Sequence, residues 1–136
     1  MSMLAAFRPT LTAGMLATLA ACTTVSAGGG NGGRMIEDGQ EFSMHSGEQV
    51  TLGDHSTLRY VRVVSDSRCP PGKQCIWAGD AEVAFAWTGA NAAMQPFSLH
   101  TSKDPKMQTA GERRLTLLSL AWGEAPEVQL RIERLP

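Results

Sequence analysis

Apolar residues alternate with polar or small residues in several short segments of this sequence. The alternation is clearest over residues 81–88, where Val83, Phe85 and Trp87 fall on one side of an extended chain, and over residues 128–133. Successive side chains of a strand point to opposite faces, so this period of two predicts strands with one face in a core. No segment sustains a helical period over three turns, and we therefore expect an all-β fold.

The sequence predicts about seven strands, separated by turn-forming Gly, Pro, Asn and Asp residues. The segments are 40–45, 48–52, 57–65, 81–88, 95–101, 114–120 and 128–133. The connector 53–56 has the length of a hairpin loop, so the second and third strands should pair. Residues 115–120, rich in leucine, also fit a helical turn. Short strands at this spacing predict a small antiparallel β-sandwich or barrel, and the pattern does not separate these two folds.

The first 21 residues have the features of a signal peptide. Arg8 is their only charged residue, and a run of apolar and small residues follows from Leu11 to Ala21. The run is about 11 residues long, whereas a membrane-spanning helix needs roughly 20. We therefore expect this segment to be removed and to contribute nothing to the folded core.

The leader ends in Leu19-Ala20-Ala21-Cys22, which resembles the lipobox of bacterial lipoprotein signal peptides. This resemblance implies cleavage before Cys22, a diacylglyceryl group on its thiol and usually a further acyl chain, such as palmitate, on its amino group. Two or three acyl chains hold a protein stably on a bilayer, which is then its expected partner. Thr23 follows where the inner-membrane retention signal would be Asp, and this implies the outer membrane, facing the periplasm.

Residues 22–34 are predicted to be a flexible tether. The segment after Cys22 consists almost entirely of Thr, Ser, Ala, Gly and Asn, and Gly28 to Gly33 form its glycine-rich centre. A Gly-rich coil of this length has a root-mean-square span of roughly 20 Å. A single β domain over residues 35–136 then remains, which is long enough for one modest core.

Cys69 and Cys75 remain as a pair once Cys22 is lipidated. An oxidising compartment favours a disulfide between them, and Pro71-Gly72 supplies the turn that brings them together. A redox or metal-binding pair is the competing interpretation. The Cys-x5-Cys spacing is not that of thioredoxin-like motifs, and no second Cys/His pair completes a zinc site.

The segment from Asp66 to Asp80 is the most distinctive motif after the leader, because it contains Ser-Arg-Cys-Pro followed closely by Cys-x-Trp-x-Gly. It resembles small exported bacterial domains, often lipoproteins, that carry the same two elements before a strand. The resemblance implies a β domain with a disulfide loop and transfers no catalytic residues. The loop can be purely structural, with Arg68 pairing with Asp66 or Asp80. Alternatively, Arg68, Lys73 and Trp77 form a recognition surface, because Trp and Arg are efficient binding residues.

No catalytic constellation is visible, and we expect a protein without enzymatic activity or cofactor. The chain lacks a Gly-x-Ser-x-Gly motif, and its carboxylates are scattered. Its 12 basic residues form no patch interleaved with aromatic residues, which argues against nucleic-acid binding. Methionine and histidine suit copper, but their spacing here is irregular and predicts no metal site. The residues in question are Met44, His45, His55, Met94, His100 and Met107.

These features predict a membrane-anchored envelope lipoprotein that binds a protein or glycan partner without catalysis. Three other functions stay open. The domain could inhibit an envelope-directed hydrolase such as lysozyme, since its size and location resemble those of known inhibitor scaffolds. It could have a structural or assembly role, or it could carry copper or zinc.

Overall fold

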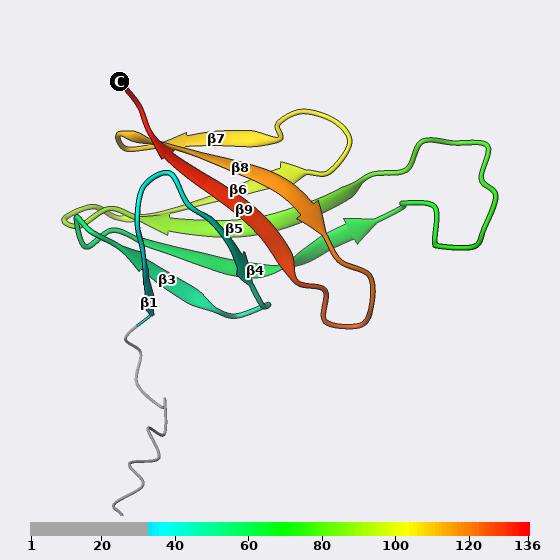
Figure 1. The fold of residues 1–136 in the computed structure, drawn as a ribbon, viewed down its shortest axis with the longest axis horizontal. Coiled ribbons are helices and arrows are strands. Elements are labelled where there is room, and N and C mark those ends of the chain that lie inside the picture. Colours follow the sequence, from blue (N-terminus) through cyan, green and yellow to red (C-terminus); the bar gives the residue numbers. More distant parts are fainter. Residues whose placement is uncertain (1–32) are drawn as a thin grey trace, which may run out of the picture.

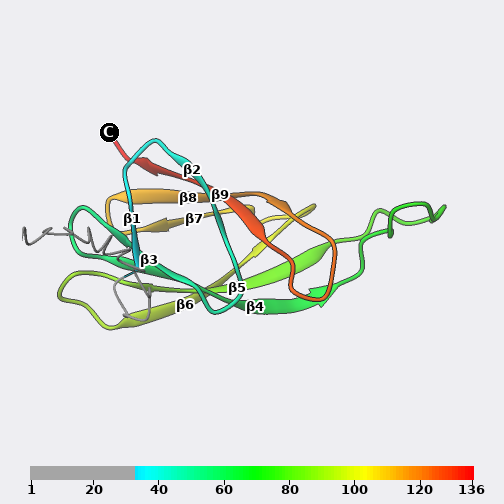
Figure 2. The ribbon, with the colours of Figure 1, turned by 60° about the horizontal axis from the view of Figure 1, so that its bottom comes forward.

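The structure is a computed structural model that describes residues 33–136, and it forms a β-sandwich of nine strands (Figures 1 and 2). The leader, the lipobox and most of the predicted tether lie outside the described residues. The strands are β1 (Arg34–Ile36), β2 (Glu41–Met44), β3 (Gln49–Leu52), β4 (Thr57–Asp66), β5 (Ala81–Thr88), β6 (Met94–His100), β7 (Met107–Ala110), β8 (Arg113–Leu120) and β9 (Val128–Arg134). Within residues 33–136 the structure has no helix that could span a membrane.

Two sheets pack face to face, as the two layers in Figure 2 show. One sheet has five strands in the order β1-β3-β4-β5-β6, and the other has four in the order β2-β9-β8-β7. All neighbours pair antiparallel except β1 and β3, which are parallel. The sequence allowed either a sandwich or a barrel, and the structure is the sandwich.

The core lies between the two inner faces and follows the predicted alternation. On β5, Val83, Phe85 and Trp87 are buried, and β9 contributes Val128, Leu130 and Ile132. The aromatic ring of Tyr60 on β4 lies 5.7 Å from that of Phe85, centroid to centroid. Burial of alternate side chains from both sheets is what stabilises a sandwich of this kind.

All seven predicted strands are present, and the hairpin between β3 and β4 forms around residues 53–56. The helical alternative for residues 115–120 is wrong, because this segment pairs along its length with β9. The prediction missed β1 and β7, of three and four residues. β1 begins at Arg34, within the predicted tether, and Gly33 already lies against Gln49 of β3.

Candidate functional site

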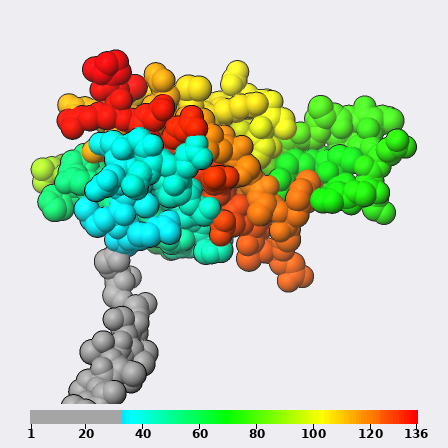
Figure 3. All heavy atoms as spheres, viewed as in Figure 1, coloured from blue at the N-terminus to red at the C-terminus, as the bar shows by residue number. Residues whose placement is uncertain are grey.

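The loop between β4 and β5, residues 67–80, extends well beyond the sandwich (Figure 3). We call it the stapled loop, because the predicted disulfide joins Cys69 to Cys75 with their Cα atoms 5.8 Å apart. The N–H of Lys73 donates to the carbonyl oxygen of Pro70 at 3.1 Å, and Gly72 has a φ of 76°. This is the geometry of the predicted turn at Pro71-Gly72, which needs a positive φ at its third position.

The two ends of the stapled loop meet closely at its base. The N–H of Ser67 donates to the carbonyl oxygen of Asp80 at 2.8 Å, and the Ser67 hydroxyl also contacts the Asp80 backbone. The indole N–H of Trp77 donates to the Ser67 carbonyl oxygen at 3.1 Å. A Cβ atom on Gly79 would lie 1.9 Å from the same oxygen, so this position has room only for glycine. The motif residues Trp77 and Gly79 thus hold the base of the loop.

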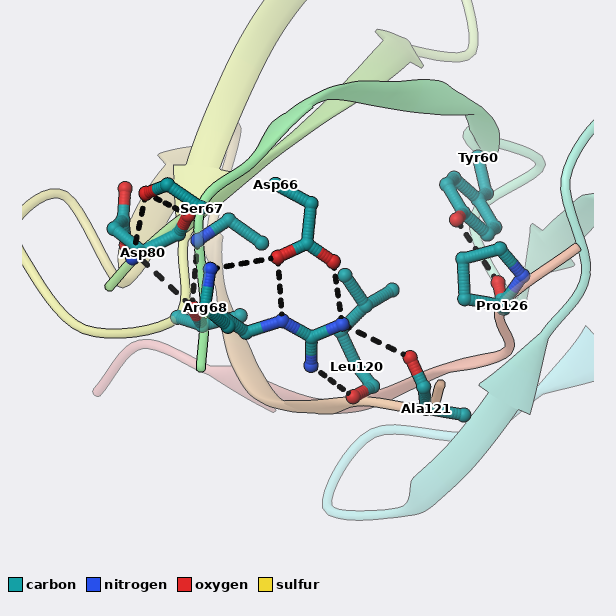
Figure 4. A network of polar contacts seen from close by, with 10 residues as sticks. Tyr60, Asp66, Ser67, Arg68, Asp80, Leu120, Ala121 and Pro126 are labelled. Carbon is teal, nitrogen blue, oxygen red and sulfur yellow. Dashed lines mark hydrogen bonds and ion pairs between the residues drawn. The ribbon is translucent and has the colours of Figure 1, made fainter. Parts of the chain in front are cut away.

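Arg68 connects the stapled loop to the second sheet (Figure 4). Its Nε and Nη2 donate to the two carboxylate oxygens of Asp66 at 2.9 and 2.7 Å. Its Nη1 donates to the carbonyl oxygen of Leu120 at 2.6 Å, and Nη2 also donates to that of Ala121 at 3.1 Å. The guanidinium carbon lies 3.9 Å from the ring centroid of Trp122. We call Arg68 and these partners the Arg68 clamp.

Contacts with Arg68 lower the pKa of Asp66. The side-chain hydrogen bond from Arg68 is the main cause, and the backbone N–H of Arg68 adds to it, while partial burial opposes the shift. Because Arg68 donates in a bidentate arrangement and its side chain is only 13% exposed, this ion pair is stronger than an exposed one.

Asp80 supports the other side of the loop base. Its carboxylate accepts hydrogen bonds from the Ser102 N–H at 2.9 Å and lies 2.7 Å from Nδ1 of His100. Burial raises the pKa of Asp80, but the Ser102 N–H, His100 and the nearby Lys103 ammonium outweigh burial and leave that pKa below its ordinary value. The carboxylate therefore stays ionised and fixes the start of β5 to the end of β6.

The loop that joins β8 to β9, residues 121–127, is also fixed. The hydroxyl of buried Tyr60 donates to the carbonyl oxygen of Pro126 at 3.0 Å (Figure 4). The N–H of Ala121 donates to the carbonyl oxygen of Glu127 at 2.8 Å. Burial raises the pKa of Tyr60 above its ordinary value, because it disfavours the charged phenolate.

Three large apolar side chains are exposed on these two fixed loops. Ile76 is fully exposed, Trp77 is 58% exposed and Trp122 is 47% exposed. Lys73 is also exposed on the stapled loop. We call Lys73, Ile76, Trp77 and Trp122 the clamp-end surface, after the Arg68 clamp at this end of the sandwich. The first three lie on the stapled loop, and Trp122 lies beside Arg68. Large apolar residues held in a fixed arrangement at the surface are typical of a binding site, because little conformational entropy is lost on contact.

The three predicted recognition residues, Arg68, Lys73 and Trp77, are not all available to a partner. Lys73 and Trp77 lie on the clamp-end surface, whereas the guanidinium of Arg68 is used within the clamp. Ile76 and Trp122 were not among the residues predicted from the sequence. The signal for Ile76 was an Ile-Trp pair directly after Cys75, in a loop otherwise composed mainly of polar, Pro and Gly residues. Nothing near Trp122 in the sequence indicates that it lies beside Arg68.

The histidines and methionines considered as metal ligands are spread over the domain. Met44 is fully buried in the core, while Met94 and Met107 are exposed on different sheets. His45 lies beside Glu127, and His100 beside Asp80. Among residues 33–136 no three His, Cys, Asp or Glu side chains are placed to hold a metal ion together.

Asp80 and His100 are the one His–carboxylate pair among the described residues whose two side chains are both mostly buried. Such a pair also occurs in catalytic sites, where the histidine activates a nucleophile. Here the carboxylate is shared with the backbone of Ser102 at the base of the stapled loop, which accounts for the pair structurally. Comparison with protein families, curated proteins and solved structures finds no match to this chain.

Proposed function

We propose that this chain is a lipid-anchored protein of the bacterial cell envelope, and that it binds a protein partner through the clamp-end surface without catalysing a reaction. One observation carries the proposal: Ile76, Trp77 and Trp122 are exposed on loops held by a disulfide, the Arg68 clamp and the Tyr60 hydroxyl. Aromatic residues in a preorganised surface are frequent hot spots of protein interfaces.

The position of the surface agrees with attachment through the amino-terminal side. β1 lies toward one end of the long axis, and the stapled loop extends from the other end (Figures 1 and 2). A tether that joins the lipidated Cys22 to β1 would leave the clamp-end surface free to meet a partner. The lipobox residues Leu19 to Cys22 support such an anchor.

The anchor is tested by a Cys22→Ser substitution in a bacterial host. The parent protein should partition into the detergent phase, and its mass should include acyl chains on Cys22. The C22S variant should remain in the aqueous phase because it has no thiol to modify. A parent protein that is unmodified and aqueous would rule out the anchor.

The binding surface is tested with a photo-crosslinking amino acid in place of exposed Gln74, which leaves Ile76 intact, used in intact cells to capture the partner. Binding of the purified partner is then measured for the parent, for Ile76→Ser and for Met107→Ser. Met107 is an exposed apolar residue on β7 and is the matched control. Ile76→Ser should weaken binding at least about tenfold, as expected for a hot spot, and Met107→Ser should not. Equal affinities for parent and Ile76→Ser would contradict the proposal.

A hydrolase inhibitor is a second candidate, because the stapled loop protrudes beyond the sandwich and could enter an enzyme cleft (Figure 3). Its partner would then be an enzyme whose activity falls on binding. The discriminating measurement is hydrolysis by lysozyme with and without the purified protein. Inhibition that is lost in Ile76→Ser would favour this candidate, and unchanged hydrolysis would remove it for lysozyme.

A further inference from the structure

The outer face of the five-stranded sheet has an apolar groove at β4, β5 and β6. Its volume is about 570 Å³, within the range of pockets that hold small molecules. The floor includes Ala84 and Ala86 of β5, and Val61, Met94 and Pro96 contribute to its sides. Ala86 is buried although it lies on an outer face, because larger side chains on both neighbouring strands flank it.

A β-bulge in β4 creates one side of this groove. Without it, Arg59 and Arg62 would point to opposite faces, since they are three residues apart. The register shift between Tyr60 and Arg62 places both arginines on the outer face, where Arg59 pairs with Ala86 and Arg62 with Ala84. The same bulge leaves Val61 exposed beside them.

The two arginines of the groove have no carboxylate partner among residues 33–136. By contrast, ion pairs are formed by Arg34, Arg68, Arg113, Arg131 and Arg134. The groove has no acidic residue in its lining. The groove is therefore positively charged. A ligand that matches both its apolar floor and its arginines is apolar and carries one anionic group.

We propose that this groove binds an anionic single-chain amphiphile, a fatty acid, with the hydrocarbon chain over Ala84 and Ala86 and the carboxylate on Arg59 and Arg62. A peptide fits less well, because the backbone groups of β4 and β5 are used in the sheet and leave few partners for peptide N–H and C=O groups. A hydrocarbon chain has no such groups. The groove lies away from the clamp-end surface, so the proposal does not depend on the proposed function.

The test is calorimetric titration of the purified protein with dodecanoate below its critical micelle concentration. Dodecanol, which lacks the charge, and acetate, which lacks the chain, are titrated in parallel. Dodecanoate should bind, dodecanol should bind more weakly, and acetate should not bind measurably. Shorter fatty acids should bind several-fold more weakly for each methylene removed. Absence of dodecanoate binding, or binding of an acidic peptide in its place, would overturn the proposal.

Three variants test where dodecanoate binds. Arg59→Gln/Arg62→Gln should weaken dodecanoate binding at least about tenfold and leave dodecanol unaffected. Ala84→Leu should fill the floor and weaken both. Arg114→Gln, at an exposed position on the other sheet, is the matched control and should change neither. Thermal unfolding confirms that each variant is folded. Unchanged dodecanoate affinity in the first two variants would overturn the proposed site.

Discussion

At the residue scale, Gly79 shows how closely the ends of the stapled loop approach each other. A Cβ atom there would clash with the carbonyl oxygen of Ser67 and with the Cα of Arg68. We predict that Gly79→Ala lowers the free energy of unfolding by about 2 kcal/mol or more, because backbone must move to relieve the clash. Gly53→Ala is the control, since nothing lies within 4 Å of its Cβ position. Urea unfolding measures both, and equal stabilities would contradict the prediction.

Arg113 is a second residue whose role depends on distant partners. Its side chain is 7% exposed and donates to Asp38 at 2.6 and 3.1 Å and to Asp54 at 2.5 Å. The hydrogen bonds to Asp38 are the main cause that raises the pKa of Arg113 above its ordinary value; burial opposes this shift, and the hydrogen bond to Asp54 adds to it. The sequence shows only an Arg-Arg pair, in which the buried member is not distinguishable from its neighbour.

We predict that Arg113→Met lowers the free energy of unfolding by about 2 kcal/mol. Hydrogen bonds between charged groups are lost, while the two carboxylates are exposed enough to regain water. Arg114→Met, next along β8 but exposed, should change stability by less than about 0.5 kcal/mol. Denaturant unfolding of both variants is the measurement. A similar loss for each would show that the buried ion pairs are not the cause.

At the scale of elements, the disulfide of the stapled loop is a local feature that lies outside the core. The disulfide closes a short loop outside the sandwich, and no core residue belongs to it. We predict that Cys69→Ser/Cys75→Ser lowers the free energy of unfolding by about 2 kcal/mol and leaves the β-sheet circular dichroism unchanged. Hydrogen exchange should become faster within residues 67–80 only. Faster exchange throughout β5 would contradict this local role.

The strands that the sequence predicted are those whose alternation extends over a whole segment, such as β5 and β9. β1 was missed because three residues do not establish a period. β7 was missed because Met107–Ala110 does not alternate, unlike β2 and β3, which are equally short. The leucine run in β8 suggested a helical turn because a register shift between Leu117 and Ser119 interrupts the alternation there. Two-residue periodicity therefore identifies strands, but not the bulges within them.

The site was predictable only in its local part. The disulfide and its turn were predicted from three features together: the pairing of Cys69 with Cys75 once Cys22 is assigned to lipidation, the expected oxidising compartment, and Pro71-Gly72 between the two cysteines. The partners of Arg68 beyond Asp66 lie more than 50 residues away in sequence, at the end of β8. Such a contact depends on the packing of two sheets, which no local pattern records. The sequence therefore left two roles open for Arg68. Pairing with Asp66, the local one, is present in the structure. For recognition its guanidinium is not free, because it is held within the clamp.

At the scale of the whole molecule, an arginine joins the two sheets at each end of β8. Arg113, at its start, reaches Asp54 in the turn between β3 and β4. Arg68, in the stapled loop that follows β4 of the other sheet, donates to the carbonyl oxygen of Leu120 at its end. Because these contacts lie at opposite ends, their contributions to stability should be independent. The carboxylates involved then link the stability of the whole sandwich to pH.

Acid should therefore destabilise the sandwich. Burial opposes the shift, but hydrogen bonds from Ser56 and Arg113 lower the pKa of Asp54 to about 2, and the pKa of Asp66 is lowered too. A carboxyl whose pKa is lower in the folded state stabilises the protein above its unfolded pKa, 3.8 for Asp. This stabilisation is lost as pH falls through the folded pKa.

We predict that the free energy of unfolding is nearly constant between about pH 7 and 5 and falls between about pH 4 and 2, where the unfolded chain binds more protons than the folded one. Asp54→Asn should be less stable at neutral pH and should show a shallower fall in acid, because one titrating group is removed. Glu124→Gln, an exposed carboxylate in the loop between β8 and β9, is the control and should follow the parent curve. Urea unfolding across this pH range is the measurement. A parent protein as stable at pH 3 as at pH 6 would mean that these ion pairs contribute nothing to the folded state.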